Sequence, residues 1–260
     1  MKLDGKVAIV TGGGGAMGGA QARLFAREGA AVAVADLFVE KARAVADDIG
    51  ADGGRAIALH LDVRSSSDWA RAVADTEHAF GPVSILCNNA GSNYRVSFDD
   101  QTEEMWDQIL GSILTGSFLG TKAAVPSMRR RGGGVIMNLG SLASIRAGGG
   151  APAYGAAKTG LVALTRSTAV SYARDGIRCV IVSPGHVDTP FIRDDNPYSP
   201  NDPSTSIDNP ANYDRRLRST PLGRLQTPDD IARTVLFVVS DDASMITGSM
   251  ITVDGGAALT

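Results

Sequence analysis

Short apolar runs rich in Val and Ile recur along the whole chain, and Ala-rich segments of helical periodicity separate most of them. Strands that are buried on both faces are continuous apolar runs, and strands that alternate with helices form parallel sheets covered by those helices. The strand-like runs span 7–10, 31–36, 56–63, 83–91, 134–141, 177–185 and 250–256, and the helical segments lie near 17–28, 39–49, 67–79, 103–130, 152–173 and 229–239. The pattern predicts an α/β fold with a single doubly wound parallel sheet of about seven strands and helices on both faces, as in a Rossmann fold.

No linker divides this alternation before Pro190, and the last strand-like run follows the interruption. We therefore expect one catalytic domain over residues 1–260. Residues 190–222 are polar and rich in proline, and the segment is too long for an ordinary connection. We expect it to form a lid at about 190–222 over the substrate, with a disordered insertion as the alternative.

Composition narrows the class of protein. The 260 residues are 43% hydrophobic and 20% charged, with a formal net charge of -3, so no excess of basic residues is available for nucleic acid. The N-terminus lacks the features of a signal peptide, and no apolar run approaches the ~20 residues that cross a bilayer. We expect a cytoplasmic protein with no membrane association. Cys87 and Cys179 lie in apolar runs, which favours buried reduced thiols, and His60, His78 and His186 are scattered, so we expect no metal.

A glycine-rich loop follows the first strand and opens the first helix. Residues 11–19 read TGGGGAMGG, and such glycines let backbone N–H groups approach a pyrophosphate at a helix N-terminus. By itself the cluster also fits a flexible turn. Asp36 strengthens the interpretation because it ends the second strand 18 residues beyond Gly18, where a carboxylate can accept both hydroxyls of an adenosine ribose.

The same carboxylate bears on the choice between NAD and NADP. Its charge repels a 2′-phosphate, and Leu37 and the glycines at 13–15 leave no Arg or Lys in the loop or beside Asp36 to neutralise one. NAD is therefore the expected cofactor. The alternative is a surface Asp that caps the helix at 39–49.

Tyr154 and Lys158 lie four residues apart in the expected helix at 152–173, so both side chains share one face, one turn apart. An ammonium about 4 Å from a phenol, at an effective dielectric of ~20, favours phenolate by roughly 4 kcal/mol and lowers the phenol pKa by about three units. Tyr154 then suits a general acid or base. The same spacing also occurs by chance on exposed helix faces.

Several further motifs appear in a fixed order along the chain. They are the glycine loop, Asp62-Val63 after the third strand, Asn88-Asn89-Ala90-Gly91 at the fourth, Ser141 thirteen residues before Tyr154, Lys158, Pro184-Gly185 and the closing Val253-Asp254-Gly255-Gly256. Together they resemble the short-chain dehydrogenase/reductase family, from Leu3 to Gly256. A chance resemblance would not reproduce so many motifs in the same order along the chain.

The resemblance implies a role for each matching residue. Tyr154 exchanges a proton with the substrate oxygen, Ser141 hydrogen-bonds that oxygen, and Lys158 lowers the phenol pKa and binds the nicotinamide ribose. The implied cofactor-binding set is Gly12, Gly15, Met17, Gly18, Asp36, Leu37, Asp62, Val63, Asn89, Ala90, Gly91, Leu139, Tyr154, Lys158, Pro184, Gly185, Val187 and Thr189. Kinship also implies a homotetramer, a dimer of dimers paired through helices 103–130 and 152–173.

Two positions depart from the family's pattern. Ala16 stands where the loop normally has glycine, and Ile113 stands where the family usually has an asparagine that joins a proton relay to the lysine. Isoleucine cannot hydrogen-bond, so we expect reduced or rerouted proton exchange, or a bound water that covers the role. Ser112 points about 100° away around the helix, and Ser117 lies one turn along on a similar face.

Substrate choice in this fold depends on the segments around the catalytic centre, here 93–96, 142–151, His186 and the lid from Phe191. Their polar and basic residues are Asn93, Arg95, Arg146, His186 and Arg193. The set favours a hydroxylated or anionic small-molecule substrate, and solvated loop charges are the alternative.

The sequence thus favours an NAD-dependent oxidoreductase, an alcohol dehydrogenase or ketone reductase acting on a secondary alcohol or carbonyl. The departures at Ala16 and Ile113 leave a catalytically silent dinucleotide-binding protein as the second hypothesis. A sugar epimerase or dehydratase is the third, although such relatives usually carry a larger C-terminal domain.

Overall fold

Seven parallel strands form one sheet in the order β3-β2-β1-β4-β5-β6-β7 in a computed structural model, which describes residues 1–146 and 152–260. The strands are β1 Val7–Thr11, β2 Ala31–Asp36, β3 Arg55–His60, β4 Ile85–Asn88, β5 Gly134–Leu139, β6 Ile177–Pro184 and β7 Met250–Val253. The strand order reverses between β1 and β4, and this is the place where open α/β sheets bind ligands, beyond the carboxyl ends of the strands. The predicted doubly wound Rossmann fold is confirmed.

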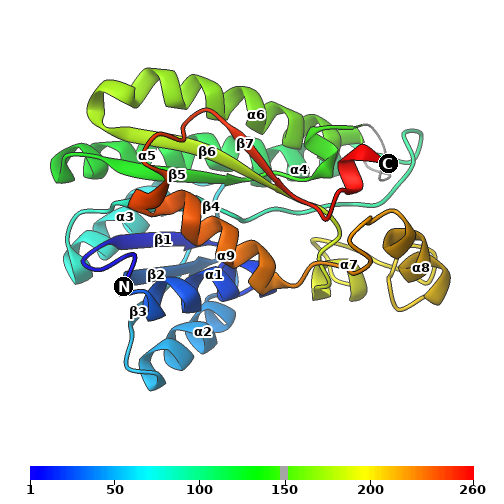
Figure 1. The fold of residues 1–260 in the computed structure, drawn as a ribbon, viewed down its shortest axis with the longest axis horizontal. Helices are drawn as coiled ribbons and strands as arrows, with labels where there is room; N and C mark the ends of the chain where they lie inside the picture. Colours follow the sequence, from blue (N-terminus) through cyan, green and yellow to red (C-terminus); the bar gives the residue numbers. More distant parts are fainter. Residues whose placement is uncertain (147–151) are drawn as a thin grey trace.

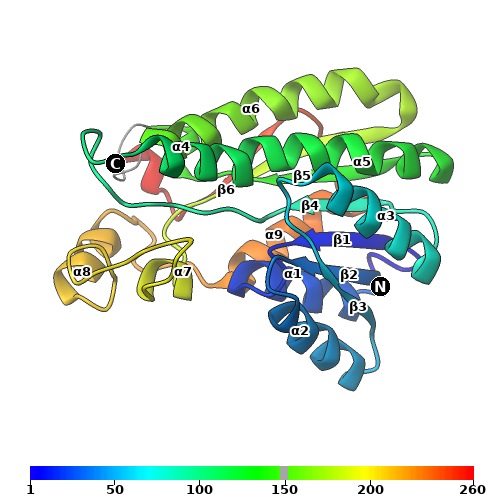
Figure 2. The ribbon, with the colours of Figure 1, turned by 180° about the vertical axis from the view of Figure 1, so that it is seen from behind.

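Helices cover both faces of the sheet. They are α1 Ala16–Arg27, α2 Val39–Ala51, α3 Ser66–Phe80, α4 Glu103–Leu110, α5 Gly116–Arg131, α6 Pro152–Tyr172, α7 Pro190–Arg193, α8 Pro210–Arg218 and α9 Pro228–Val239. One face carries α1, α2 and α9 (Figure 1), and the other carries α3, α4, α5 and α6 (Figure 2). The chain is therefore a three-layer sandwich.

Alternate residues of the central strand divide the core between these two layers. Ala8 and Val10 of β1 pack with Phe25 of α1 and the apolar face of α9, whereas Ile9 packs with Trp69 of α3. This is the period of two that a strand imposes, here with apolar side chains at both phases. The continuous apolar runs in the sequence are explained by burial on both faces.

The expected helix at 103–130 is interrupted. Between α4 and α5, the residues Gly111–Thr115 form a π-helical turn, and Ile113 lies within it. Single π turns inside α-helices occur mostly at functional sites.

The polar segment 190–222 contains two helices, α7 and α8, rather than irregular chain throughout. Each has Pro at its start, and the Asn209 side chain accepts a hydrogen bond from the Ala211 N–H to cap α8. Both helices lie beyond the carboxyl end of the sheet, away from the sandwich (Figure 1). Two of the prolines that suggested an irregular loop, Pro190 and Pro210, are instead the first residues of helices.

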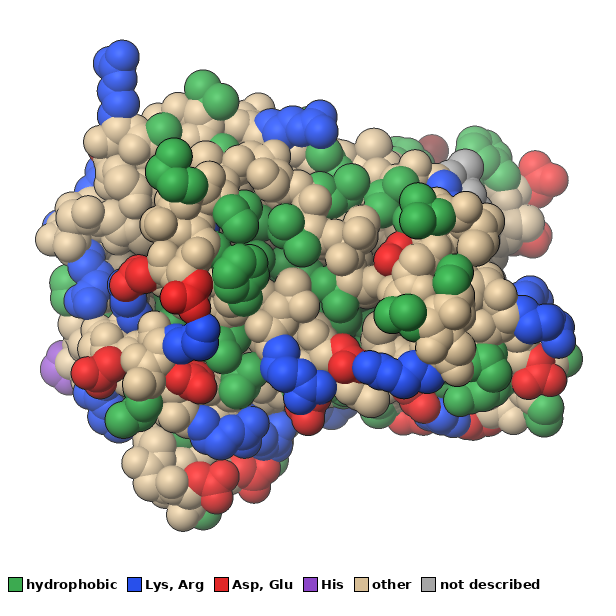
Figure 3. All heavy atoms as spheres, in the orientation of Figure 1, with side chains coloured by type: hydrophobic (Ala, Val, Ile, Leu, Met, Phe, Trp, Pro, Cys, Tyr) green, Lys and Arg blue, Asp and Glu red, His purple; other side chains and the backbone are tan. Residues whose placement is uncertain are grey.

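The surface drawn in Figure 3 has Lys and Arg side chains beside Asp and Glu side chains along its lower part. Residues 1–146 and 152–260 contain no group of three His, Cys, Asp or Glu side chains placed to ligate a metal. No helix in this described part combines the length and apolarity that a bilayer crossing requires. Cys87 and Cys179 are free and buried, as expected, and burial raises the pKa of Cys179 to about 12.

Candidate active site

A cavity of about 590 Å³ opens at the carboxyl ends of the strands, where the strand order reverses. Fifteen of the eighteen expected cofactor-binding residues line it: Gly12, Gly15, Met17, Gly18, Asp36, Leu37, Asp62, Val63, Asn89, Ala90, Gly91, Leu139, Tyr154, Lys158 and Thr189. Pro184, Gly185 and Val187 lie at and beyond the end of β6 without lining the cavity, and Ser141 does not line it either. The sequence motifs are therefore brought together by the sheet, although they are far apart along the chain.

The glycine loop leaves a backbone surface free at the N-terminus of α1. No side chain caps this helix and its first turn holds no acidic residue, so its first N–H groups remain available for an anion. A Cβ on Gly18 would stand 2.2 Å from the Gly12 carbonyl oxygen, so only glycine lets the loop pass so close to the helix. The positive end of α1 and its bare backbone fit a pyrophosphate, and Ala16 opens the helix within this wall of the cavity.

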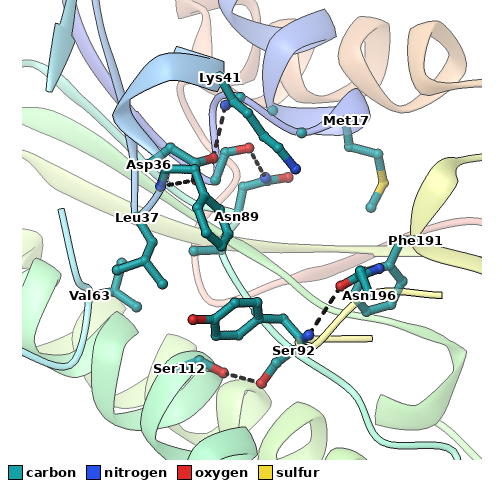
Figure 4. Close-up of a pocket in the computed structure, with 18 of the residues that line it drawn as sticks. Met17, Asp36, Leu37, Lys41, Val63, Asn89, Ser92, Ser112, Phe191 and Asn196 are labelled. Carbon is teal, nitrogen blue, oxygen red and sulfur yellow. Dashed lines mark hydrogen bonds between the residues drawn. The ribbon is translucent and has the colours of Figure 1, made fainter. Parts of the chain in front are cut away.

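Asp36 is held at the end of β2 by two backbone donors. The Gly14 and Phe38 N–H groups each donate to one of its carboxylate oxygens, both at 3.0 Å. Each oxygen keeps a second lone pair for a ligand hydroxyl. Lys41 also lines this part of the cavity, with its Nζ 5.1 Å from the centre of the Phe38 ring, and Figure 4 shows it near Asp36. The sequence interpretation missed Lys41, because it considered only the loop and the neighbours of Asp36.

The Asn89–Gly91 segment is bonded to the glycine loop. The Thr11 hydroxyl accepts hydrogen bonds from the Asn89 and Ala90 N–H groups, both at 3.0 Å, and the Asn89 amide donates to the Thr11 carbonyl at 3.0 Å. Gln21 in turn donates to the Asn89 side-chain oxygen at 3.1 Å. These bonds fix the middle of the cavity wall.

At the next part of the wall, the Arg64 guanidinium pairs with Asp62 and keeps the pKa of that carboxyl below its usual value.

Helix α6 presents Tyr154 and Lys158 to the cavity, as their spacing predicts. Lys158 is buried, and its Nζ donates to the Leu139 carbonyl at 2.6 Å and lies 5.5 Å from the centre of the Tyr154 ring. Burial lowers the pKa of Lys158 to about 7. The amine therefore gains or loses a proton near neutral pH.

Tyr154 differs from the expectation. The protein packed around its phenol raises the pKa, while the Ser141 side chain and the positive charge of Arg95 act in the opposite direction. The Lys158 Nζ lies 5.5 Å from the centre of the Tyr154 ring, and burial lowers the pKa of Lys158 to about 7. The expected lowered pKa of Tyr154 is therefore wrong for this structure, because burial of the phenol outweighs Ser141 and Arg95.

Ser141 is positioned by a short capped turn. It precedes the 3₁₀ turn Leu142–Ser144, and its hydroxyl accepts from the Ala143 N–H at 3.2 Å. Ser144 accepts from the Ser141 N–H at 3.2 Å and donates to the Lys158 carbonyl at 3.0 Å. Ser144 thus ties Ser141 to α6, and the sequence interpretation did not single it out.

Ile113 is 1% exposed and packs in an apolar cluster with Ala153, Ala157 and the ring of Tyr154. Ser117 does not face the cavity, because its hydroxyl donates to the Ile113 carbonyl at 2.7 Å. Ser112, which helical spacing had directed elsewhere, lines the cavity, and its hydroxyl lies 2.8 Å from that of Ser92 (Figure 4). The π-helical turn accounts for the difference, because it changes the angle between successive side chains.

The lid lies against the segment that follows β4. Arg95 donates to the Ser199 hydroxyl at 2.8 Å and to the Phe191 carbonyl at 3.0 Å, and the Tyr198 ring meets the Phe38 ring edge-on, with centroids 5.5 Å apart. Lid residues such as Phe191 and Asn196 line the cavity (Figure 4). The segment expected to form a lid therefore lines the cavity and contacts Phe38 beside Asp36.

Of the polar residues expected around the substrate, Arg193 is already neutralised. Its guanidinium pairs with both carboxylate oxygens of Asp188 at 2.7 Å and contacts Asp208. Burial and neighbouring positive charges lower the pKa of His186 to about 4, so it is neutral at pH 7. Of the expected segment 142–151, residues 147–151 lie outside the described residues.

Comparison with known proteins agrees with this geometry. A solved structure described as the crystal structure of gox2181 superposes with a TM-score of 0.91 at 31% identity, and the match covers 100% of this chain and 98% of the other. A family model described as enoyl-(acyl carrier protein) reductase matches residues 14–258. The chain belongs to the short-chain dehydrogenase/reductase family.

Among the relatives of this short-chain dehydrogenase/reductase are two that are named as dehydrogenases of cyclic alcohols. It is 35% identical to 2,5-dichloro-2,5-cyclohexadiene-1,4-diol dehydrogenase LinX of Sphingobium indicum, over 98% of this chain and 97% of the relative. It is 36% identical to trans-4-hydroxycyclohexanecarboxylate dehydrogenase of Sinomonas cyclohexanicum, over 96% of this chain and 92% of the relative. The predicted family is confirmed, and its members generally bind a nicotinamide dinucleotide.

Proposed function

We propose that the chain is an NAD-dependent oxidoreductase that interconverts a secondary alcohol and its ketone, with Ser141, Tyr154 and Lys158 as catalytic residues. The observation that carries the proposal is the meeting of Tyr154 and Lys158 at the cavity wall, with Ser141 beside the phenol. A bound nicotinamide supplies the acceptor or donor of the hydride. The α1 N-terminus, Gly18 and Asp36 fit the phosphates and ribose of such a dinucleotide.

In the reduction direction, the Tyr154 hydroxyl donates its proton to the substrate carbonyl oxygen, which Ser141 holds by a hydrogen bond. The raised pKa of Tyr154 keeps this proton in place until the substrate oxygen takes it. In the oxidation direction, the Tyr154 oxygen must accept the alcohol proton. The tyrosine must therefore be a phenolate. Lys158, with a pKa of about 7, stabilises this phenolate when its Nζ is protonated, because an ammonium favours a nearby negative charge.

We propose NAD rather than NADP because Asp36 faces the position of the adenosine ribose with its carboxylate fixed by Gly14 and Phe38. A carboxylate accepts from ribose hydroxyls and repels a 2′-phosphate. Lys41 offers a positive charge at the same end of the cavity, so the preference is testable at that residue. The affinities for NAD and NADP, measured by calorimetry, are expected to favour NAD in the native protein and to favour it less in the Asp36→Asn variant.

We propose a cyclic secondary alcohol with a polar substituent as the substrate class. The relatives described above act, by their names, on a cyclic diol and on a hydroxycyclohexanecarboxylate. A polar substituent is supported by two partly buried arginines, Arg95, which hydrogen-bonds to the lid, and Arg216, which lies on α8 within it.

The test of this function is NADH formation from NAD with a panel of cyclohexanol, cyclic diols and 4-hydroxycyclohexanecarboxylate. Turnover of any member supports the oxidoreductase. NAD binding without turnover of any alcohol, and without reduction of the matching ketones, would favour the silent dinucleotide-binding protein instead.

We also propose one catalytic domain over residues 1–260 with the lid at 190–222, and a cytoplasmic homotetramer. Large apolar side chains on the outer helices support assembly, because Phe118 of α5 is 49% exposed and Val170 of α6 is 81% exposed. Light scattering coupled to size-exclusion chromatography tests the oligomeric state.

A further inference from the structure

Two arginines near the carboxyl end of the sheet, one of them within charge range of Tyr154, have no carboxylate partner in the described part of the chain. Arg95 and Arg216 are both partly buried, and neither forms an ion pair within 4.0 Å of a described Asp or Glu. By contrast, Arg193 of the same lid contacts two carboxylates. A partly buried cation without a counter-ion carries a desolvation cost that an anionic ligand would offset.

Arg216 has an unused donor that faces away from solvent. It lies on α8, and its Nη2 donates to the Thr205 carbonyl at 3.3 Å. Its Nη1 is buried and has no hydrogen-bond partner among residues 1–146 and 152–260. Because buried polar groups in proteins are nearly always hydrogen-bonded, this nitrogen is a candidate ligand donor.

Arg216 is held next to the end of β6. The Ser219 hydroxyl, less than one turn later on the chain, donates to the Arg216 carbonyl at 2.9 Å and lies 3.3 Å from Nε2 of His186. His186 lies two residues after Pro184, the last residue of β6. The link from Arg216 through Ser219 to His186 therefore ties α8 to the carboxyl edge of the sheet.

The same group is linked to the phenol through charge rather than through the dinucleotide cavity. Arg216, His186 and Arg95 do not line the dinucleotide cavity. The positive charge of Arg216 acts on Arg95, and that of Arg95 acts on Tyr154. An anionic group bound by Arg216 would thus belong to a molecule that extends from the phenol toward the lid.

The local field at His186 agrees with an anion site. Arg216, Arg146 and Arg215 all add positive charge there, and together with burial they hold His186 in its neutral form at pH 7. Arg215 and Arg216 lie on α8 and Arg146 lies after the turn that follows β5, so the positive field comes from two parts of the chain rather than from α8 alone.

We propose that Arg216, supported by Ser219 and His186, binds a carboxylate on the substrate while the substrate's carbinol oxygen reaches Tyr154 and Ser141. The substrate is then a hydroxy acid whose charged group is separated from the reacting carbon by a ring or a spacer of similar length. This inference rests on the proposed function for the placement of the carbinol, but the anion site itself does not depend on turnover.

The first test measures binding of cyclohexanecarboxylate, which has no hydroxyl to oxidise, to the full chain with NAD present. Calorimetry compares it with neutral cyclohexanecarboxamide, and the Arg216→Gln variant is compared with Arg218→Gln, which removes the same charge from an exposed position of the same helix. We expect the native protein and Arg218→Gln to prefer the carboxylate. Arg216→Gln should lose about tenfold to a hundredfold in carboxylate affinity, the range for hydrogen bonds to charged groups.

Equal binding of the two probes, or equal loss in both variants, would overturn the proposal. Arg216→Lys guards against a folding defect, because it keeps the charge and should recover part of the affinity if the charge is what matters. Benzenesulfonate, run in parallel, tells whether the site takes an oxyanion in general. If the sulfonate binds more tightly than the carboxylate, the assignment of a carboxylate is wrong and the assigned group becomes a sulfonate.

The second test separates this inference from the proposed function. With 4-hydroxycyclohexanecarboxylate and its methyl ester as substrates, Arg216→Gln should raise KM for the acid about tenfold or more and leave KM for the ester nearly unchanged. If both are oxidised with equal KM by the native protein, the function holds and the anion site is wrong. If neither is oxidised but Arg216-dependent carboxylate binding persists, the anion site holds and the function is wrong.

Discussion

Replacing Lys158 with Met should stabilise the protein without cofactor below neutral pH, although it removes a proposed catalytic residue. Burial lowers the Lys158 pKa from 10.5 to about 7, and one pKa unit corresponds to about 1.4 kcal/mol. The folded state therefore disfavours the charged amine by about 5 kcal/mol when both states are protonated. Loss of the hydrogen bond to the Leu139 carbonyl offsets roughly 1 to 3 kcal/mol of the gain.

The sign of the pH dependence follows from the lowered folded-state pKa. The destabilisation of the native protein by Lys158 is fully present below about pH 7. It disappears as the pH rises toward 10.5, because between these pH values only the unfolded chain holds the Lys158 proton. Urea unfolding at several pH values is expected to show Lys158→Met more stable by about 2 to 4 kcal/mol near pH 6, with most of that advantage lost above pH 9.

The matched control is Lys122→Met, an exposed position on α5 where the change should be below about 0.5 kcal/mol throughout. A Lys158→Met variant that is less stable than the native protein at every pH, or whose advantage does not depend on pH, would refute the argument from burial.

Three further substitutions test the geometry of the site. Gly18→Ala places a Cβ 2.2 Å from the Gly12 carbonyl oxygen, so calorimetry should show NAD binding weakened about tenfold or more, and unchanged affinity would contradict the close-approach argument. Ser144→Ala removes the bond to the Ser141 N–H, so kcat should fall about tenfold with the NAD affinity unchanged; a parallel loss of both would indicate a general structural defect. Ile113→Asn buries an amide in an apolar cluster, so thermal unfolding should reveal a loss of about 1 to 3 kcal/mol, whereas an unchanged Tm would mean that the amide finds partners there.

The fold could be predicted from the sequence because its strands are buried on both faces. Continuous apolar runs such as the one at β1 indicate strands of a covered parallel sheet when helices separate them. The glycine loop marks where the first strand leads into the first crossover helix. The π-helical turn around Ile113 and the helices of the lid were not predicted. The π-helical turn inserts a single residue, and hydrophobic periodicity is too coarse to reveal it. Helix α8 is short and polar, and it is stabilised by its caps and by tertiary contacts rather than by an apolar face.

The site was predictable only where its residues lie in motifs. Tyr154 and Lys158 were found from their spacing, but spacing says nothing of how deeply an ammonium is buried, so the direction of the phenol pKa was wrong. Lys41 and Ser144 reach the site through the packing of α2 and of the turn after β5. Lys41 lies five residues after Asp36, in the first turn of α2, so a search of that turn for basic residues would have suggested it.

The most direct test of the proposed function compares the native protein with Tyr154→Phe in NADH formation from a cyclic secondary alcohol, at NAD concentrations that saturate both. We expect the variant to bind NAD as tightly as the native protein and to lose at least about a hundredfold in kcat, because only the proton-transferring hydroxyl is removed. A variant that retained native kcat would contradict the assignment of Tyr154 as the acid and base of this site.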